Sequence, residues 1–256
     1  MTALPERSAT LAAVRDDDPA QAAPALRALH PAQPVADLPE VAALPSDLPA
    51  GSWPRLHDLA RRVGARCVRP VLRMRVHHAG RIPTTGPVVL VANHSALVDG
   101  PLLFGLLGRR AVFLVKHEMF RGPLAVALVA IGQLPVRRGA TDPAPLRAAV
   151  AVLRGGGLVG VFPEGTRGSG DVAAAHHGAA WLARAAGASV LPVVIRGTRR
   201  PPGSRLRIRP RVDVLVGAPL AVPAGGGRAG LTDATETVRA ALAGLVVELD
   251  HLRSST

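Results

Sequence analysis

The hydrophobic positions of the chain gather in four short apolar runs separated by helix-length segments. The runs begin near residues 88, 111, 157 and 190, and each is rich in Val, Leu or Ile. Nearly continuous apolar runs of this length are typical of strands buried on both faces of a parallel sheet. The pattern predicts an α/β fold with a largely parallel central sheet flanked by helices.

An amphipathic helical segment precedes this core, from Trp53 to Arg75. Its apolar side chains recur at spacings of three and four: Leu56, Ala60, Val63, Cys67, Val71 and Met74. Arginines crowd the remaining surface, and Pro70 is expected to kink or end the helix. Two interpretations stay open. The helix lies in the headgroup layer of an anionic membrane, or it packs on the domain with a solvated charged face.

The chain divides into three predicted parts. Residues 1–50 are rich in Ala, Pro and Asp without sustained periodicity and are expected to form a disordered tail. Residues 51–80 hold the basic amphipathic segment, and residues 81–256 form the main domain. Within it, residues 205–222 alternate Arg with apolar side chains and predict added strands, and residues 232–252 predict a final helix.

Charge and hydropathy narrow the classes of partner. The net charge is +13, although the predicted tail is acidic, so the main domain is strongly basic. Nucleic acid is disfavoured, because the chain has only four Phe, two Trp and no Tyr for stacking on bases. An anionic membrane surface fits better. The most apolar piece, Leu124 to Ile131, is too short to span a bilayer and predicts a buried helix.

The N-terminus is acidic and proline-rich, unlike a signal peptide. Together with the basic main domain, this predicts a peripheral protein on the cytoplasmic side of the cell membrane. Cys67 is the single cysteine, and the adjacent histidine pairs lack partners at metal-ligand spacing. We therefore expect no metal and no cofactor.

A candidate acid–base pair follows the first apolar run. His94 and Asp99 are five residues apart, so they do not share a face of a regular helix and meet only if residues 95–98 form a turn. A carboxylate on one ring nitrogen of histidine leaves the other nitrogen to take a proton from a hydroxyl. The alternative is that Asp99 only caps the following helix and that His94 is an ordinary buried polar residue.

A second motif follows the third apolar run, where Phe162-Pro-Glu-Gly-Thr-Arg167 ends a strand-like segment. Glycine at position 165 lets the backbone approach a ligand closely, and the fork of Arg167 suits phosphate oxygens. Two further apolar runs end near cations, at Lys116 and Arg138.

The order of these motifs resembles the glycerolipid acyltransferase family, and within it the bacterial 1-acylglycerol-3-phosphate acyltransferases. The matching segments are Asn93-His-Ser-x-x-x-Asp99, Gly132-x-x-x-x-x-Arg138, Phe162-Pro-Glu-Gly-Thr-Arg167 and Leu191-Pro-Val193. The likeness spans residues 72–222. A lone H-x4-D pair is weak evidence, but four motifs in order form a specific pattern.

The resemblance implies a role for each matching residue. His94 corresponds to the general base and Asp99 to its orienting partner. Arg138 and Arg167 correspond to the arginines that hold the phosphate of the acceptor. The remaining residues implied at the substrate site are Lys116, Glu164, Gly165 and Thr166. The implied reaction moves an acyl chain from acyl-CoA or acyl carrier protein to a lysophospholipid acceptor.

Two departures from the family pattern concern the acceptor. Arg137 stands where many relatives have an acidic residue, and His176-His177 replaces an aromatic and a lysine. Either difference could retune the preferred acceptor, so glycerol phosphate, another lysophospholipid and an amino-acid lipid remain alternatives. A further alternative is a non-enzymatic protein that binds anionic membranes.

Overall fold

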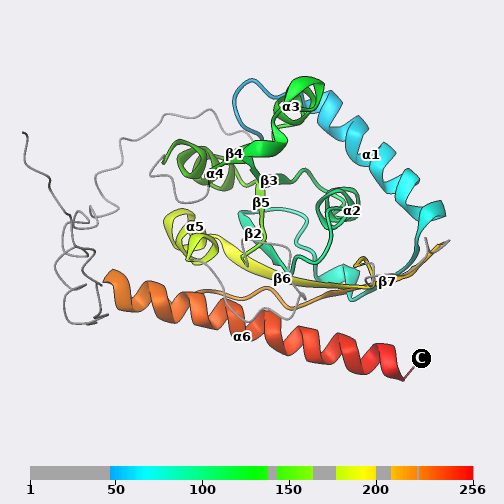
Figure 1. The fold of residues 1–256 in the computed structure, drawn as a ribbon. Coiled ribbons are helices and arrows are strands. Elements are labelled where there is room, and N and C mark those ends of the chain that lie inside the picture. The colour runs from blue at the N-terminus through cyan, green and yellow to red at the C-terminus, as the bar shows by residue number, and fades with distance from the viewer. Residues whose placement is uncertain (1–46, 138–142, 164–176, 200–208, 224, 256) are drawn as a thin grey trace, which may run out of the picture. The chain divides into compact units, whose positions relative to one another are not determined.

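The computed structural model describes residues 47–137, 143–163, 177–199, 209–223 and 225–255. They belong to one compact unit, residues 41–256, which Figure 1 shows as a ribbon. The strands are β1 (Arg73–His77), β2 (Val88–Ala92), β3 (Val112–Lys116), β4 (Leu134–Val136), β5 (Leu158–Val161), β6 (Ser189–Arg196) and β7 (Arg211–Val216). The helices are α1 (Pro54–Val71), α2 (Asp99–Leu106), α3 (Gly122–Ala130), α4 (Ala144–Arg154), α5 (Gly178–Ala186) and α6 (Gly227–Ser254), with 3-10 turns η3 (Ala79–Arg81) and η4 (His117–Met119).

The strands form a seven-stranded sheet in the order β1-β7-β6-β2-β5-β3-β4. The five strands from β6 to β4 are parallel to one another, whereas β7 is antiparallel to β6 and carries β1 parallel to itself. The predicted α/β fold with a mostly parallel sheet is therefore confirmed. The carboxyl ends of β2, β5, β3 and β4 share one edge of the sheet, and the starts of β1 and β7 lie at that same edge.

Helices cover both faces of the sheet, as Figure 1 shows. One face packs against α4, α5 and α6 around buried side chains such as Val89, Val159 and Leu242. The other packs against α2 through side chains such as Leu90, Leu103 and Ile195. Side chains of β2 alternate between these two clusters, which is why its whole sequence is apolar. Because both faces of β2 are buried, the strand cannot slide in the sheet, and the residues that follow it are therefore held in place.

Helix α1 packs on α2 with a face that the sequence pattern did not predict. His57 is fully buried, its Nδ1 lies 2.7 Å from the carbonyl oxygen of Ile131, and burial lowers the pKa of its ring. At Gly105 an added Cβ would lie 2.8 Å from the backbone nitrogen of Ala65, so the two helices cross in close contact. The interpretation in which α1 packs on the domain is therefore correct for this inner face.

Part of the predicted apolar stripe of α1 remains on the surface, because Val63, Cys67 and Val71 are exposed. The helix ends at Val71, one residue after Pro70, and not near Arg75. Arg73 to His77 form the edge strand β1 instead, because their backbone pairs with β7.

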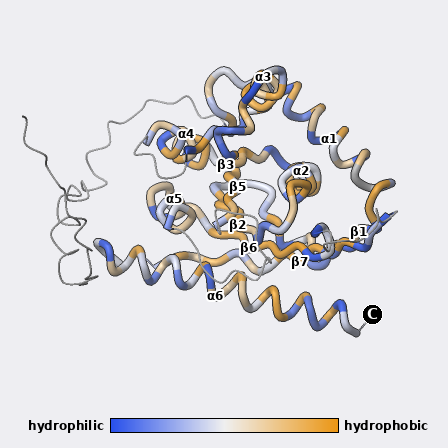
Figure 2. The backbone as a smooth tube through the Cα atoms, in the orientation of Figure 1, coloured by the Kyte–Doolittle hydropathy of each residue, from blue (hydrophilic) through white to orange (hydrophobic). Residues whose placement is uncertain are grey.

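Helix α3 corrects a second expectation. Its apolar sequence predicts a buried helix, yet it has no buried residue. Leu124, Val126 and Val129 are all exposed, with 72 % of Val126 accessible. Figure 2 shows the hydrophobic colouring of this helix. Hydrophobic character alone could not reveal exposure, because burial depends on which neighbours cover a helix.

No helix in the described part of the chain is both long enough and apolar enough to span a bilayer.

Candidate active site

A turn at the end of β2 brings His94 and Asp99 together. The imidazole Nδ1 lies 3.3 Å from Asp99 Oδ2. The backbone N–H groups of Ser95 and Ala96 each donate to the same oxygen at 2.8 Å. The carboxylate thus folds back over its own turn, and the predicted meeting of the two side chains is confirmed. Asp99 is the first residue of α2 and the cap position is Val98, so the capping alternative is not what the structure shows.

Asp99 is fully buried, which sets its electrostatics. Burial by itself would raise the pKa of this carboxyl group. Hydrogen bonds from His94, from Thr198 and from the two turn amides outweigh that effect and hold the pKa below its ordinary value. Asp99 is therefore a carboxylate at neutral pH. It can orient the ring of His94 and stabilise that ring when protonated.

A stack of aromatic rings supports the imidazole. Phe162, just after β5, lies parallel to the ring of His94 at a centroid distance of 4.2 Å, and Phe113 of β3 lies 6.1 Å beyond it. Gly160 makes room for this arrangement, because a Cβ there would lie 2.3 Å from Phe113. The packing limits the ring orientations of His94 and leaves Nε2 as the nitrogen that Asp99 does not engage.

Two contacts join the turn to β6. Asn93 is fully buried, donates to the carbonyl oxygen of Ile195 at 3.0 Å and accepts its N–H at 2.8 Å. Ser95 Oγ lies 3.1 Å from the hydroxyl oxygen of Thr198, which follows β6. The two hydrogen bonds of Asn93 thereby fix where the chain leaves β2 relative to β6, and Thr198 lies next to Asp99.

Sequence reasoning assigned no function to Phe162, Asn93 or Thr198. Phe162 and Asn93 belong to sequence motifs that also contain candidate site residues, and this proximity was the signal that could have identified them. Nothing near Thr198 in the sequence indicates that it reaches Asp99, because the contact depends on the pairing of β2 with β6.

Most residues implied at the substrate site lie outside the described residues: Arg138, Glu164, Gly165, Thr166 and Arg167. The described residues before them end β4 at Val136 and β5 at Val161. Both strands are parallel members of the sheet that also ends at His94, so both motifs leave it at the same edge. The assignments of these residues stay predictions.

Lys116 is described at the end of β3, where about half of its side chain is exposed. Its ammonium lies 3.0 Å from Glu118, so the structure places it in a surface ion pair. Arg137, at the exit of β4, donates to Nε2 of His117 at 3.1 Å. Arg137 thus adds positive charge to the edge where β2 ends, whereas Glu118 balances the charge of Lys116.

The described residues contain no group of three or more His, Cys, Asp or Glu side chains placed to hold a metal ion. The groups found at the end of β2 suit acid–base chemistry: a carboxylate, an imidazole and aromatic support. An imidazole oriented in this way can take a proton from a hydroxyl group as that hydroxyl attacks an electrophile.

Comparison with known proteins points in the same direction. A family profile described as Acyltransferase matches residues 73–196, which run from the start of β1 to the end of β6. The 1-acyl-sn-glycerol-3-phosphate acyltransferase of Bacillus subtilis (strain 168) is 28 % identical over 162 residues, covering 61 % of this chain and 80 % of that protein. The protein of the same name from Borreliella burgdorferi is 32 % identical over 121 residues, or 46 % of this chain and 48 % of that protein.

One solved structure is similar along most of the chain. It is the crystal structure of the 1-acyl-sn-glycerophosphate (LPA) acyltransferase, PlsC, from Thermotoga maritima, with a TM-score of 0.59 and 26 % sequence identity. The similarity covers 75 % of this chain and 79 % of that one. It therefore takes in much of the described sheet and its flanking helices.

Proposed function

We propose that this chain, which belongs to the lysophosphatidic acid acyltransferase family, catalyses acyl transfer to a lipid acceptor. In the proposed reaction, a fatty acyl chain moves from a thioester donor to the free hydroxyl of 1-acylglycerol-3-phosphate, giving phosphatidic acid. The observation that carries this proposal is the imidazole of His94, held by the buried carboxylate of Asp99 at the end of β2. The assignment of the acceptor is based on the names of the relatives from Bacillus and Borreliella. Membership of an enzyme family sets aside the non-enzymatic alternative.

The proposed reaction needs one base and no covalent enzyme intermediate. Nε2 of His94 takes the hydroxyl proton as the oxygen attacks the thioester carbonyl, forming a C–O bond. The carbon–sulfur bond then breaks, and the departing sulfur takes the proton back from the imidazolium. Asp99 stabilises that imidazolium while it exists. General-base help of this kind contributes roughly 10²–10⁴-fold to the rate, so positioning of the acceptor supplies much of the rest.

Positioning is assigned to the cations of the neighbouring strand ends. In the proposal, Arg138 and Arg167 bind the phosphate of the acceptor so that its hydroxyl points at His94. Support comes from β4 and β5, which end at the same sheet edge as β2 and lead directly into these two motifs. Charge-assisted, two-pronged bonds from arginine to phosphate are strong and directional.

An acceptor panel tests the proposal. The purified protein is given a long-chain acyl thioester together with 1-acylglycerol-3-phosphate, glycerol 3-phosphate or 1-acylglycerophosphocholine, and labelled products are separated. We expect 1-acylglycerol-3-phosphate to have the highest kcat/KM. A higher value for either of the others would contradict the proposed acceptor while leaving the acyltransferase chemistry in place.

One observation favours a second acceptor class. The pair of Arg137 with His117 replaces an acidic position with a cation beside the exit of β4. Added positive charge there suits an acceptor with more negative charge than a lysophosphatidic acid. An acceptor with two phosphate groups is added to the panel for this test. The variant Arg137→Glu restores the acidic position, and a shift from that acceptor toward 1-acylglycerol-3-phosphate in the variant would support this alternative.

We also propose that the protein binds an anionic membrane through α1 and α3. Their exposed apolar side chains form one set, here called the α1–α3 surface: Trp53, Leu59, Val63, Val71, Leu124, Val126 and Val129. The two elements adjoin, because the N–H of Trp53 donates to the carbonyl oxygen of Ala130 at 2.8 Å. Exposed apolar side chains in such number on two adjoining helices are typical of an interaction surface.

Arginines accompany the α1–α3 surface. Arg55, Arg62 and Arg66 of α1 are exposed, and each arginine near an anionic bilayer adds about 1 kcal/mol of attraction. Leu97, in the turn between His94 and Asp99, is exposed as well. An apolar side chain beside the candidate base suits an acceptor whose acyl chain stays in the lipid layer.

Flotation with vesicles containing phosphatidylglycerol tests the membrane proposal. The variant Val126→Asp should raise the apparent Kd for these vesicles about tenfold or more, because a carboxylate replaces an apolar group that would enter the lipid. Val247→Asp on α6 is the matched control, since Val247 is also exposed, at 56 %. Equal weakening in both variants would contradict the assignment of this surface.

A further inference from the structure

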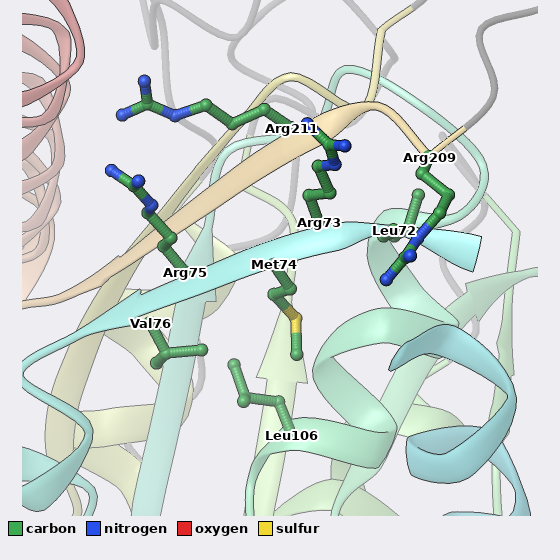
Figure 3. A pocket seen from close by; sticks show the side chains of 8 residues that line it. All are labelled: Leu72, Arg73, Met74, Arg75, Val76, Leu106, Arg209 and Arg211. Carbon is green, nitrogen blue, oxygen red and sulfur yellow. The ribbon is translucent and has the colours of Figure 1, made fainter. Parts of the chain in front are cut away.

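A cavity of about 630 Å³ opens at the β1 edge of the sheet. Its floor is apolar, formed by Met74 and Val76 of β1 together with Leu106 of α2. Figure 3 shows these three side chains on one face of the strand, with Arg209 reaching across the start of β1 toward the same side. The volume falls within the roughly 300–1,000 Å³ of small-molecule sites.

Arginines line the rest of this cavity, and Arg73, Arg75 and Arg211 lie on the face of β1 opposite its apolar floor (Figure 3). Arg73 of β1 lies opposite Arg211 of β7 in the strand register, and Arg75 follows on the same face of β1 (Figure 3). Among the described residues, the ion pairs of this edge are those of Asp213, and none of them involves Arg73, Arg75 or Arg209. These three guanidinium groups are therefore available to an anionic ligand.

The backbone of Arg209 supports a ligand-binding role. Its φ angle is 53°, in the left-handed region that residues other than glycine seldom adopt. Such conformations gather at active sites and ligand-binding sites. Here the conformation accompanies a side chain that reaches over the cavity.

The cavity mouth lies at the same sheet edge as the candidate base. Ser95, in the turn after His94, contacts Thr198 at 3.1 Å. The preceding Gly197 passes so close to β7 that an added Cβ would overlap the carbonyl oxygen of Arg211. Three strand spacings of about 4.8 Å separate β2 from β1, so the arginines lie about 14 Å to the side of His94.

A thioester donor with phosphates at its far end matches this layout. We propose that the β1-edge cavity binds the nucleotide end of acyl-CoA, with the adenine on the apolar floor and the phosphates crossing the open side of the edge strand β1 to reach Arg209, Arg73 and Arg75. The pantetheine arm then crosses the start of β7 and the end of β6 and delivers the thioester to His94. The inference rests on the proposed function, and it selects CoA over acyl carrier protein as the donor.

Steady-state kinetics with two donors test the inference. One donor is palmitoyl-CoA, and the other is palmitoyl-pantetheine, which has the same thioester but neither phosphates nor adenosine. The double variant Arg73→Gln/Arg209→Gln should raise KM for palmitoyl-CoA by about tenfold or more, because charge-assisted bonds to phosphate are lost. KM for palmitoyl-pantetheine, KM for the acceptor and kcat should stay within about twofold.

A matched control keeps the change in net charge the same. The double variant Arg147→Gln/Arg228→Gln removes two exposed arginines from α4 and α6, and it should leave both donors unaffected. An equal rise of KM for both donors in the β1-edge variant would overturn the proposal. With palmitoyl-acyl carrier protein added as a third donor, a loss confined to that donor would also overturn the proposal, because it would identify a protein-docking surface instead.

A binding measurement separates this site from the proposed reaction. Titration calorimetry with free CoA needs no acceptor and no turnover. We expect the wild-type protein to bind CoA and the β1-edge variant to bind it at least about tenfold more weakly. Absent or equal binding would overturn the site, whereas CoA binding without transfer to any lysophospholipid would contradict the proposed function alone.

Discussion

Two buried aspartates of this protein each lie beside a histidine, and they differ in what balances their charge. Asp99 and Asp213 are both fully buried. Asp99 Oδ2 lies 3.3 Å from His94, whereas Asp213 Oδ1 lies 3.8 Å from His77, beyond hydrogen-bond distance. In both residues, Oδ1 has no hydrogen-bond partner in the described part of the chain. Proximity of the two residue types is thus common to both sites.

The partners of the two carboxylates separate the sites. Asp99 accepts from two backbone N–H groups, from the imidazole of His94 and from Thr198, and no described guanidinium or ammonium group pairs with it. Asp213 accepts from Arg211 at 2.9 Å and from Arg253 at 2.5 Å, which ties β7 to the end of α6. The backbone N–H groups that bind Asp99 carry only partial charges, so its negative charge can still stabilise an imidazolium. The negative charge of Asp213 is instead balanced by the full positive charges of two guanidinium groups.

A histidine near a buried carboxylate is therefore a weak signal by itself. The signal becomes strong when backbone amides hold the carboxylate and the histidine lies at the carboxyl edge of the parallel strands. The pair of His94 with Asp99 meets both conditions. His77 and Asp213 meet neither, and their surroundings indicate a structural clamp.

The largest expected effect comes from Asp99→Asn. The asparagine amide is neutral, so it cannot stabilise the imidazolium of His94 as the Asp99 carboxylate does. We therefore expect kcat to fall by roughly 10²-fold or more. Acyl transfer under saturating substrates measures the effect, and circular dichroism checks folding. A folded variant with kcat within about threefold of the wild type would contradict the assigned role of Asp99.

A smaller effect, on stability, is expected from Asp213→Ala. The substitution leaves Arg211 and Arg253 without their shared partner and should lower the free energy of unfolding by about 2–3 kcal/mol. This is less than for a fully buried pair, because the two guanidinium side chains are 32 % and 27 % exposed. Urea unfolding measures it. At a temperature where the variant is folded, kcat should match the wild type; a 10²-fold loss would erase the contrast between the two sites.

The smallest effect is expected at a partly exposed ion pair, which serves as the reference for the two buried aspartates. Arg110 donates to both oxygens of Asp58 at 3.0 and 2.8 Å and so holds α1 on the domain. Asp58→Asn should cost about 1 kcal/mol or less, since both side chains are partly exposed.

This reference pair also predicts a pH dependence. The hydrogen bond from Arg110 lowers the pKa of Asp58, so the stabilisation is complete above the ordinary pKa of about 3.9 and is lost as the pH falls through the lower folded value. Urea unfolding of the wild type and of Asp58→Asn should therefore differ by a constant amount from about pH 5 to 7 and converge below about pH 4. A gap that widens on acidification would have the wrong sign.

Much of the fold could be predicted because burial on both faces leaves a plain sequence signature. The runs that became β2, β3, β5 and β6 are apolar apart from residues at the ends of β3 and β6, and such runs are typical of strands covered on both sides. The meeting of His94 with Asp99 could be predicted as well, because a spacing of five permits contact only through a turn. Both predictions depend on local sequence.

What escaped prediction depends on distant neighbours. The stack of Phe162 on His94 requires that β5 lie beside β3 with Gly160 facing Phe113. The exposure of α3 was likewise set by which surfaces pack against it. The spacing of residues within one helix or strand does not show which distant segments will contact it.

The most direct test compares His94→Ala with His77→Ala in one assay. Acyl transfer from palmitoyl-CoA to 1-acylglycerol-3-phosphate is measured at saturating substrate concentrations, with equilibrium binding of the acceptor measured in parallel. We expect His94→Ala to lower kcat by about 10³-fold while acceptor binding is kept, and His77→Ala to stay within about threefold of the wild type. Equal activity in the two variants would contradict the assignment of His94 as the base.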